Sequence, residues 1–347
     1  MISSGQSHHF CVQEIMSTRT AIIVIIASFI IGGIATWGAE YLLNHDQATD
    51  NCQYELDTDD HFEWVKPLLF AEPKCESQEH QDLKLSIENT IDSLVAAGTL
   101  DRASFYWRDF DKGNWIGVHP EQEYHPGSLL KLGAFYNILQ QASQDTTLLN
   151  QRLTYHKTEE KIPAQTFSKK SIGEGQSYSI MELLEYMVAY SDNYATSLLH
   201  NVMSYPKYLQ IFSSLHLPLP DGSNPNYSVT ASQFSNFFKV LYNGTFLNPS
   251  MSELAIKLLM KCDFDQGMVA GLPQDTKIAH KFGEWGNREG QHELHEMAII
   301  YLGNKPYLLT IFTSGKELKQ LSPSLAVLTK KTHQYLRALN RKNSIHQ

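Results

Sequence analysis

The most constraining feature of the sequence is a long apolar run near its start. Residues 21–43 read AIIVIIASFIIGGIATWGAEYLL, in which Glu40 is the only charged residue. A run of this length can cross the hydrocarbon core of a bilayer as a helix. A cleaved signal peptide is the alternative, because Gly33, Ile34 and Ala35 resemble a small-residue cleavage site, but the apolar run continues past them. Both interpretations export the rest of the chain.

The charges on either side of this run predict its orientation. Arg19 precedes it, whereas no Lys or Arg follows until Lys66, and acidic residues dominate in between. Positive charge next to a membrane span favours the cytoplasmic side. We therefore predict a cytoplasmic tail over residues 1–20, a transmembrane signal-anchor over 21–43, and a single-pass cell-membrane protein whose main domain is periplasmic or extracellular.

The next segment, residues 44–80, is acidic. It holds ten Asp or Glu against only Lys66 and Lys74, which is typical of a polar stalk that lifts a domain off the membrane. Cys52 and Cys75 lie within this segment, and an exported chain experiences an oxidising compartment. A disulfide between them is one possibility, and isolated thiols are the other.

Composition and charge limit which kinds of partner the chain can bind. The chain has 347 residues, 42% hydrophobic and 19% charged, so it can bury a globular core. Its formal charge of −9 and the lack of a basic stripe exclude nucleic acid as a partner. The HELHE run at 292–296 departs from the zinc motif H-E-x-x-H and lies on a predicted strand, where its two histidines face opposite ways. We expect no metal and no other cofactor.

Hydrophobic periodicity after the stalk predicts an α+β domain over residues 81–341. A helical pattern is followed by the strands RASFYWRDF and NWIGVHP, by several helices, by three more strands and by a last helix. This order predicts an antiparallel five-stranded sheet flanked by helices, with an all-helical domain inserted between its two halves. The α/β part would comprise 81–127 and 265–341, and the helical part 128–264. The active site should lie where the two parts meet.

The segment HPGSLLKL contains a candidate nucleophile. Ser128 begins a predicted apolar helix, and Lys131 lies one turn later on the same face. A serine hydroxyl needs a base, and a lysine can serve when desolvation and nearby positive charge lower its pKa enough to leave it neutral. The Ser-x-x-Lys motif alone is weak, because a second match occurs at Ser204–Lys207, although that one contains Pro206.

Two further motifs support the first. Ser191-Asp192-Asn193 lies 63 residues after Ser128, where two predicted helices meet, and Lys281-Phe282-Gly283 lies 90 residues further on, on a predicted strand. An ordered set of SxxK, SDN and a KTG-like triplet is typical of class A β-lactamases and penicillin-binding proteins. Over about residues 82–340 the chain therefore resembles the class A β-lactamases.

The resemblance implies catalytic roles for four residues. Ser128 would attack the acyl carbonyl, and Lys131 would accept its proton. Ser191 would relay a proton to the leaving nitrogen. Lys281 would keep the site electropositive and attract a substrate carboxylate.

The resemblance also implies a substrate-binding set. Asn193 would hydrogen-bond the acylamide of the substrate, and the backbone N–H groups of Ser128 and Glu284 would form the oxyanion hole. Gly283 belongs to the triplet on the predicted strand. Phe282 departs from the family, which usually has a threonine hydroxyl there for the substrate carboxylate, so carboxylate recognition should be weaker or altered. Arg288 could compensate, but its NREG turn is more typical of a solvated hairpin.

A second departure concerns deacylation. Class A β-lactamases have a glutamate after the SDN helices that activates the deacylating water. Between Asn193 and Ser252 this chain has no glutamate, and Asp221 is the only acidic residue there, in a run of turn formers.

The functional prediction is acyl transfer through an acyl-Ser128 intermediate on β-lactams, with slow deacylation. A D-alanyl-D-alanine carboxypeptidase or penicillin-binding protein acting on a peptidoglycan peptide is the alternative within this class. A non-catalytic sensor of β-lactams or peptidoglycan fragments is the alternative from another class.

Overall fold

The computed structural model describes residues 52–62, 64–157, 165–220, 224, 227–287 and 289–345, together with 32, 33 and 36. The chain divides into two compact units, Met1–Cys52 and Gln53–Gln347. Almost all of the predicted membrane span, 21–43, lies outside the described residues. Among the residues that are described, no helix combines the length and the apolar character needed to cross a membrane.

A five-stranded antiparallel sheet forms the centre of the second unit, in the order β4-β3-β11-β10-β9. The first two strands of the predicted sheet meet the last three where β3 pairs with β11, with Phe105 opposite Ile311. β10 and β11 are joined by a two-residue turn in which Gly303 has a φ of +60°, a conformation that glycine adopts without strain. The strands are β3 (Arg102–Asp109), β4 (Trp115–Val118), β9 (Lys277–Gly286), β10 (His292–Leu302) and β11 (Lys305–Gly315).

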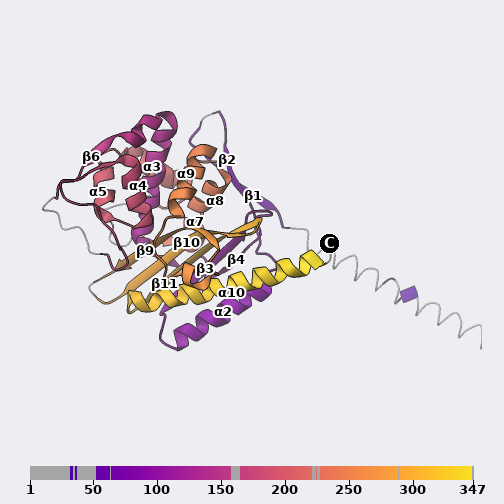
Figure 1. Ribbon diagram of the computed structural model, residues 1–347. Coiled ribbons are helices and arrows are strands. Elements are labelled where there is room, and N and C mark those ends of the chain that lie inside the picture. The colour runs from indigo at the N-terminus through magenta and orange to yellow at the C-terminus, as the bar shows by residue number, and fades with distance from the viewer. Residues whose placement is uncertain are drawn as a thin grey trace, which may run out of the picture. The chain divides into compact units, whose positions relative to one another are not determined.

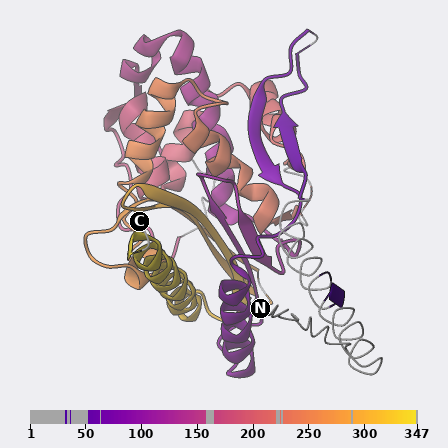
Figure 2. The same ribbon diagram turned by 90° about the vertical axis from the view of Figure 1, so that its right-hand side faces the viewer.

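Two helices cover one face of this sheet, and the helical block lies on the other (Figures 1 and 2). α2 (Gln81–Ala96) buries Leu83, Ile87 and Ile91, which recur at helical spacing and form its apolar face. α10 (Leu318–Ile345) packs against α2, β10 and β11. The predicted layers are therefore present, with β9 at the edge of the sheet.

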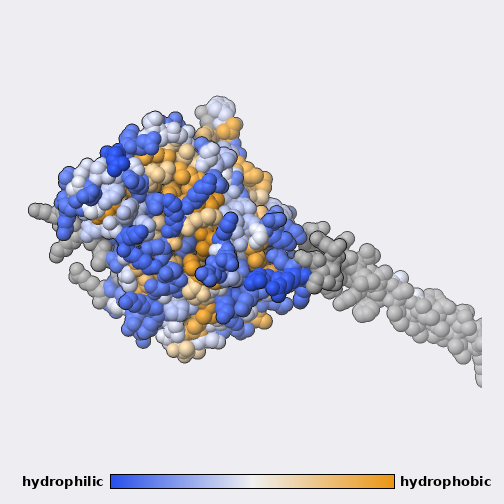
Figure 3. Space-filling model, viewed as in Figure 1, coloured by the Kyte–Doolittle hydropathy of each residue, from blue (hydrophilic) through white to orange (hydrophobic). Residues whose placement is uncertain are grey.

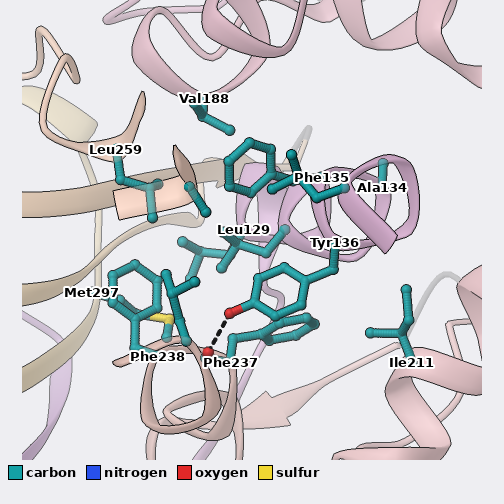
Figure 4. Close-up of a cluster of buried hydrophobic side chains, with 14 of the residues drawn as sticks. Leu129, Ala134, Phe135, Tyr136, Val188, Ile211, Phe237, Phe238, Leu259 and Met297 are labelled. Carbon is teal, nitrogen blue, oxygen red and sulfur yellow. Dashed lines mark hydrogen bonds between the residues drawn. The ribbon is translucent and has the colours of Figure 1, made fainter. Parts of the chain in front are cut away.

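The helical block is built around α3 (Lys131–Gln144). Residues 131–139 of this helix are all buried, as expected of a helix surrounded by others. Phe135 and Tyr136 pack at its centre, and the Tyr136 hydroxyl donates to the Phe237 carbonyl oxygen (Figure 4). The surrounding helices are α4 (Ile180–Ala189), α5 (Asn193–His200), α6 (Tyr205–Ser214), α7 (Ala231–Phe234), α8 (Asn236–Asn243) and α9 (Pro249–Leu259).

Short elements connect these helices. They are the two-stranded pairs β5 (Glu123–Tyr124) with β8 (Val229–Thr230) and β6 (Arg152–Thr154) with β7 (Ser177–Ser179), and the single 3₁₀ turns η1 (Gly127–Leu130), η2 (Thr146–Asn150) and η3 (Met268–Gly271). The face seen in Figure 3 is mostly polar, with apolar patches between the polar residues.

The segment predicted as an acidic stalk differs from that prediction. It contains an antiparallel hairpin, β1 (Tyr54–Thr58) with β2 (Leu68–Pro73), that belongs to the folded unit. Leu69 and Phe70 are buried, and Glu72 pairs with the buried Lys239 of α8 at 2.6 Å. The acidic composition suggested a solvated stalk because the cations that pair with Glu72, Lys239 and Arg108, both lie outside this segment.

The cysteines of this region are oxidised. Cys52 and Cys75 are both disulfide-bonded. Cys262 is a free, partly buried thiol.

Candidate active site

Ser128 lies in the 3₁₀ turn η1, which continues directly into α3 and rests against the edge strand β9. Two glycines allow this close approach. Gly127 has a φ of +53°, and a Cβ there would lie 2.3 Å from the Glu284 carbonyl oxygen. A Cβ on Gly283 would lie 2.6 Å from the Pro126 carbonyl oxygen. Since real Cβ atoms do not come so close, only glycines can bring the Ser128 turn into backbone contact with Glu284.

Ser191 connects the two lysines of the site. Lys131 Nζ donates to the Ser191 carbonyl oxygen and, at 3.1 Å, to Ser191 Oγ. Lys281 Nζ donates to the same Oγ at 2.9 Å and to the Phe282 carbonyl oxygen at 2.7 Å. One serine hydroxyl therefore touches both amines, and residues from three distant parts of the sequence meet at one point.

The turn that carries Ser191 is held in an unusual backbone conformation. Ser191 has a φ of +56°, which costs a non-glycine residue free energy and persists only when its surroundings enforce it. Asp192 supplies much of that support. Its carboxylate caps α5 by accepting from the Tyr194 N–H, and it also accepts from the Ile172 N–H and the Ser171 hydroxyl, each at 2.9 Å.

Burial governs the charge state of the lysines. It lowers the pKa of Lys131 well below its usual value, and the neighbouring Lys281 lowers this pKa further, against the opposing effect of Asp192 and Glu284. Burial also lowers the pKa of Lys281, to about 8. An amine with a lowered pKa is more often neutral at neutral pH and is then able to accept a proton.

Ser128 and Lys131 open into a cleft of about 760 Å³. Among the described residues, Ser128 Oγ makes no hydrogen bond to the protein. Three residues of α5 line the cleft at positions i, i+3 and i+7, namely Asn193, Thr196 and His200. Burial lowers the pKa of His200, so its imidazole is mainly neutral. Sequence reasoning assigned no role to His200, although its helical spacing from Asn193 was a usable signal.

A second cavity of about 570 Å³ adjoins the cleft and shares several of its residues. It is mainly apolar, with Leu130, Tyr208 and Trp285 common to both. The Trp285 ring stacks on His125 at a centroid distance of 3.8 Å, which fixes one wall. This geometry can accept a large apolar group beside Ser128.

Two residues of β9 next to Gly283 have different surroundings. The Phe282 ring is fully buried against Phe264, with ring centroids 4.6 Å apart, so it offers nothing to a ligand in the cleft. Glu284 lines the cleft, and its Oε1 accepts from the Thr166 N–H at 2.8 Å. Burial raises the pKa of Glu284, while the Thr166 N–H and the two lysines oppose that effect.

Two predicted alternatives lie outside the described residues. They are Arg288, considered for carboxylate binding, and Asp221, considered for deacylation.

The family comparison decides the identity of the fold. The model of the beta-lactamase enzyme family matches residues 86–336, well over half of the chain. The chain belongs to the beta-lactamase enzyme family. It is a serine hydrolase of the β-lactamase and penicillin-binding type, as the ordered motifs predicted.

Solved structures show the same fold at low sequence identity. A mutant of PBP-A described as an acyl-enzyme complex with penicillin G has a TM-score of 0.62 and 17% identity, covering 74% of this chain and 97% of that one. A β-lactamase from Xanthomonas campestris pv. campestris has a TM-score of 0.61 and 18% identity, covering 73% and 98%. An ancestral class A β-lactamase has a TM-score of 0.62 and 19% identity, covering 72% and 99%. No curated protein matches the sequence.

Proposed function

We propose that this protein is a membrane-anchored hydrolase whose Ser128 is acylated by β-lactams and whose acyl-enzyme is hydrolysed slowly. The observation that carries the proposal is the shared hydroxyl of Ser191, which contacts the amines of both Lys131 and Lys281. That arrangement links a base to a proton donor for the leaving group, and acyl transfer from a serine needs both.

The proposed reaction uses Lys131 as the base and Ser191 as the proton donor. Neutral Lys131 takes the proton of Ser128, whose oxygen attacks the acyl carbonyl, and the backbone N–H groups of Ser128 and Glu284 receive the developing negative charge. As the C–N bond breaks, Ser191 gives its proton to the leaving nitrogen and regains one from the Lys131 ammonium, which returns Lys131 to its neutral form. Lys281 as an ammonium supports the negative charge of the tetrahedral intermediate. Asn193 lines the cleft and would hold the acylamide, while Gly283 lets β9 approach the Ser128 turn.

Two other functions remain as alternatives. A D-alanyl-D-alanine carboxypeptidase would use the same acyl-Ser128 intermediate on a peptidoglycan peptide. The missing glutamate between Asn193 and Ser252 favours it over rapid β-lactam turnover. A non-catalytic sensor would keep the fold without the chemistry, and the complete set of Ser128, Lys131 and Ser191 argues against it.

Intact-mass spectrometry after incubation of the full chain with penicillin G tests the proposal. We expect a covalent adduct of one penicillin on Ser128, because the nucleophile, its base and the oxyanion donors are all present. Ser128→Ala should form no adduct. Ser204→Ala, which removes the serine of the second Ser-x-x-Lys match, should be acylated like the wild type. An adduct of equal yield in Ser128→Ala would refute the nucleophile assignment.

The pH dependence of acylation should be bell-shaped. The rate should rise with pH as Lys131 loses its proton, because only the neutral amine is a base. It should fall above about pH 8, where Lys281 loses the charge that supports the intermediate. The measurement is the second-order rate of adduct formation from about pH 5 to about pH 10. Lys281→Arg should remove the alkaline fall, because a guanidinium does not deprotonate in this range. A wild-type rate that stays constant above pH 8 would contradict this role of Lys281.

The anchor is proposed from the apolar run alone. Residues 21–43 have the length of a bilayer-spanning helix, and Arg19 favours a cytoplasmic tail. The full chain should therefore sediment with membranes after an alkaline wash, and a variant that begins at residue 44 behind a cleavable secretion signal should be soluble. Recovery of the full chain in the soluble fraction would exclude an uncleaved anchor.

A further inference from the structure

The carboxylate of Glu284 is only half satisfied. Oε1 accepts from the Thr166 N–H, whereas Oε2 is buried and has no hydrogen-bond partner among the described residues. A buried acceptor without a donor costs free energy, so proteins rarely leave one. Because Glu284 lines the cleft of Ser128, a ligand in that cleft is a natural source of the missing donor.

Two more unpartnered atoms belong to residues that line this cleft. Within the described part of the chain, Gln165 Nε2 and His292 Nδ1 are also buried without a hydrogen-bond partner. Both residues line the cleft together with Glu284, although they come from a loop and from β10. Three incomplete polar groups in the lining of one cleft indicate a binding site for a polar group of the ligand.

This part of the described lining offers a substrate carboxylate one free amide donor, Gln165 Nε2, but neither a hydroxyl from residue 282 nor a free lysine amine. The Phe282 ring is buried between Phe264 and Phe167, so that no hydroxyl is present where the family usually has one. Lys281 is fully buried, and its amine is engaged with Ser191 and with the Phe282 carbonyl.

A carboxylate placed here would face the carboxylate of Glu284. Two carboxylates in contact repel each other, whereas a nitrogen donor would complete the free oxygen of Glu284. Among the described residues that line the cleft, Lys131 is the one lysine, and its amine hydrogen-bonds to Ser191 instead of facing a substrate carboxylate.

We propose that Glu284 is a specificity residue that selects acyl donors bearing a carboxamide, in place of a free carboxylate, on the side of the substrate that faces β9. The inference rests on the proposed acylation of Ser128 and specifies its substrate class. The carboxamide nitrogen donates to Oε2 of Glu284, and the neutral group avoids the repulsion that a carboxylate would meet.

The test compares two acylating agents that differ in one group, penicillin G and its primary carboxamide. The second-order rate of adduct formation is measured by intact mass for each compound with the full chain, and the result is the ratio of the two rates. A ratio within one protein sample is insensitive to the fraction of inactive protein. Glu284→Gln keeps the shape of the side chain and the backbone N–H but removes the charge. Glu284→Ala removes the entire side chain that would accept from the carboxamide of the substrate. Glu289→Gln, an exposed glutamate of the following turn, is the matched control.

The wild type and Glu289→Gln should prefer the carboxamide. In Glu284→Gln and Glu284→Ala the rate with the carboxamide, divided by the rate with penicillin G, should fall by about tenfold or more. A loss of this size is expected when a contact to a charged group is removed. An unchanged ratio in both Glu284 variants overturns the proposal. A wild-type preference for penicillin G that Glu284→Gln weakens also overturns it, because Glu284 would then be protonated and would donate to a carboxylate. If neither compound acylates the wild type, the proposed function itself fails, and this inference fails with it.

Discussion

Replacing Lys131 with alanine is expected to slow acylation of Ser128 by about 10²–10⁴-fold, the usual cost of removing a general base. The structure gives the reason. Lys131 is 7% exposed, and burial together with the charge of Lys281 lowers its pKa well below the usual value, which favours the neutral amine that a general base requires. Without it, the proton of Ser128 has no acceptor in the Ser191 network.

The measurement is the rate of penicillin adduct formation by intact mass. Lys131→Arg separates the two possible roles of this side chain, because a guanidinium keeps the positive charge but cannot accept a proton. It should be as slow as Lys131→Ala. Lys207→Ala changes the exposed lysine of the second Ser-x-x-Lys match and should acylate at the wild-type rate. Acylation of Lys131→Ala at the wild-type rate would assign the proton transfer to another group.

Local patterns predicted the sheet and the helical block. Each strand and helix has its own periodicity, so Leu83, Ile87 and Ile91 could be placed on a buried face from sequence alone. The hairpin of β1 and β2 could not be predicted in this way. Its acidic residues look solvated until Lys239, more than 160 positions away, is brought against Glu72.

The site shows the same division between local and long-range information. The motifs identified Ser128, Lys131, Ser191 and Lys281 because each has a fixed local context. What the motifs could not give is the contact geometry, in which a single hydroxyl touches both amines.

The side-chain contact of Glu284 is an example of a feature that the sequence motifs did not predict. Its backbone N–H was predicted to serve the oxyanion hole, but nothing in the sequence indicated that its side chain meets Thr166 across the cleft. That contact depends on how the chain around Thr166, between β6 and β7, packs on β9, and no pattern within either segment encodes it.

The penicillin acyl-enzyme of the wild type is expected to persist for minutes or longer. Hydrolysis of the ester needs a base that activates a water, and a well-placed one accelerates the step by about 10²–10⁴-fold. In class A β-lactamases a glutamate after the SDN helices has this role, and this chain has none between Asn193 and Ser252. Acylation does not need that residue, so the adduct should form and then accumulate.

Removing excess penicillin and following the mass of the adduct over time measures its lifetime. Rapid return to the free mass, with many turnovers, would show that another group activates the water. Three candidates could then be separated by variants. Asp221→Asn tests the one acidic residue between Asn193 and Ser252, His200→Gln tests the neutral imidazole on the cleft wall, and Glu284→Gln tests the half-satisfied carboxylate. The variant whose adduct becomes long-lived identifies the base, and slow loss of the adduct from the wild type excludes an efficient one in this cleft.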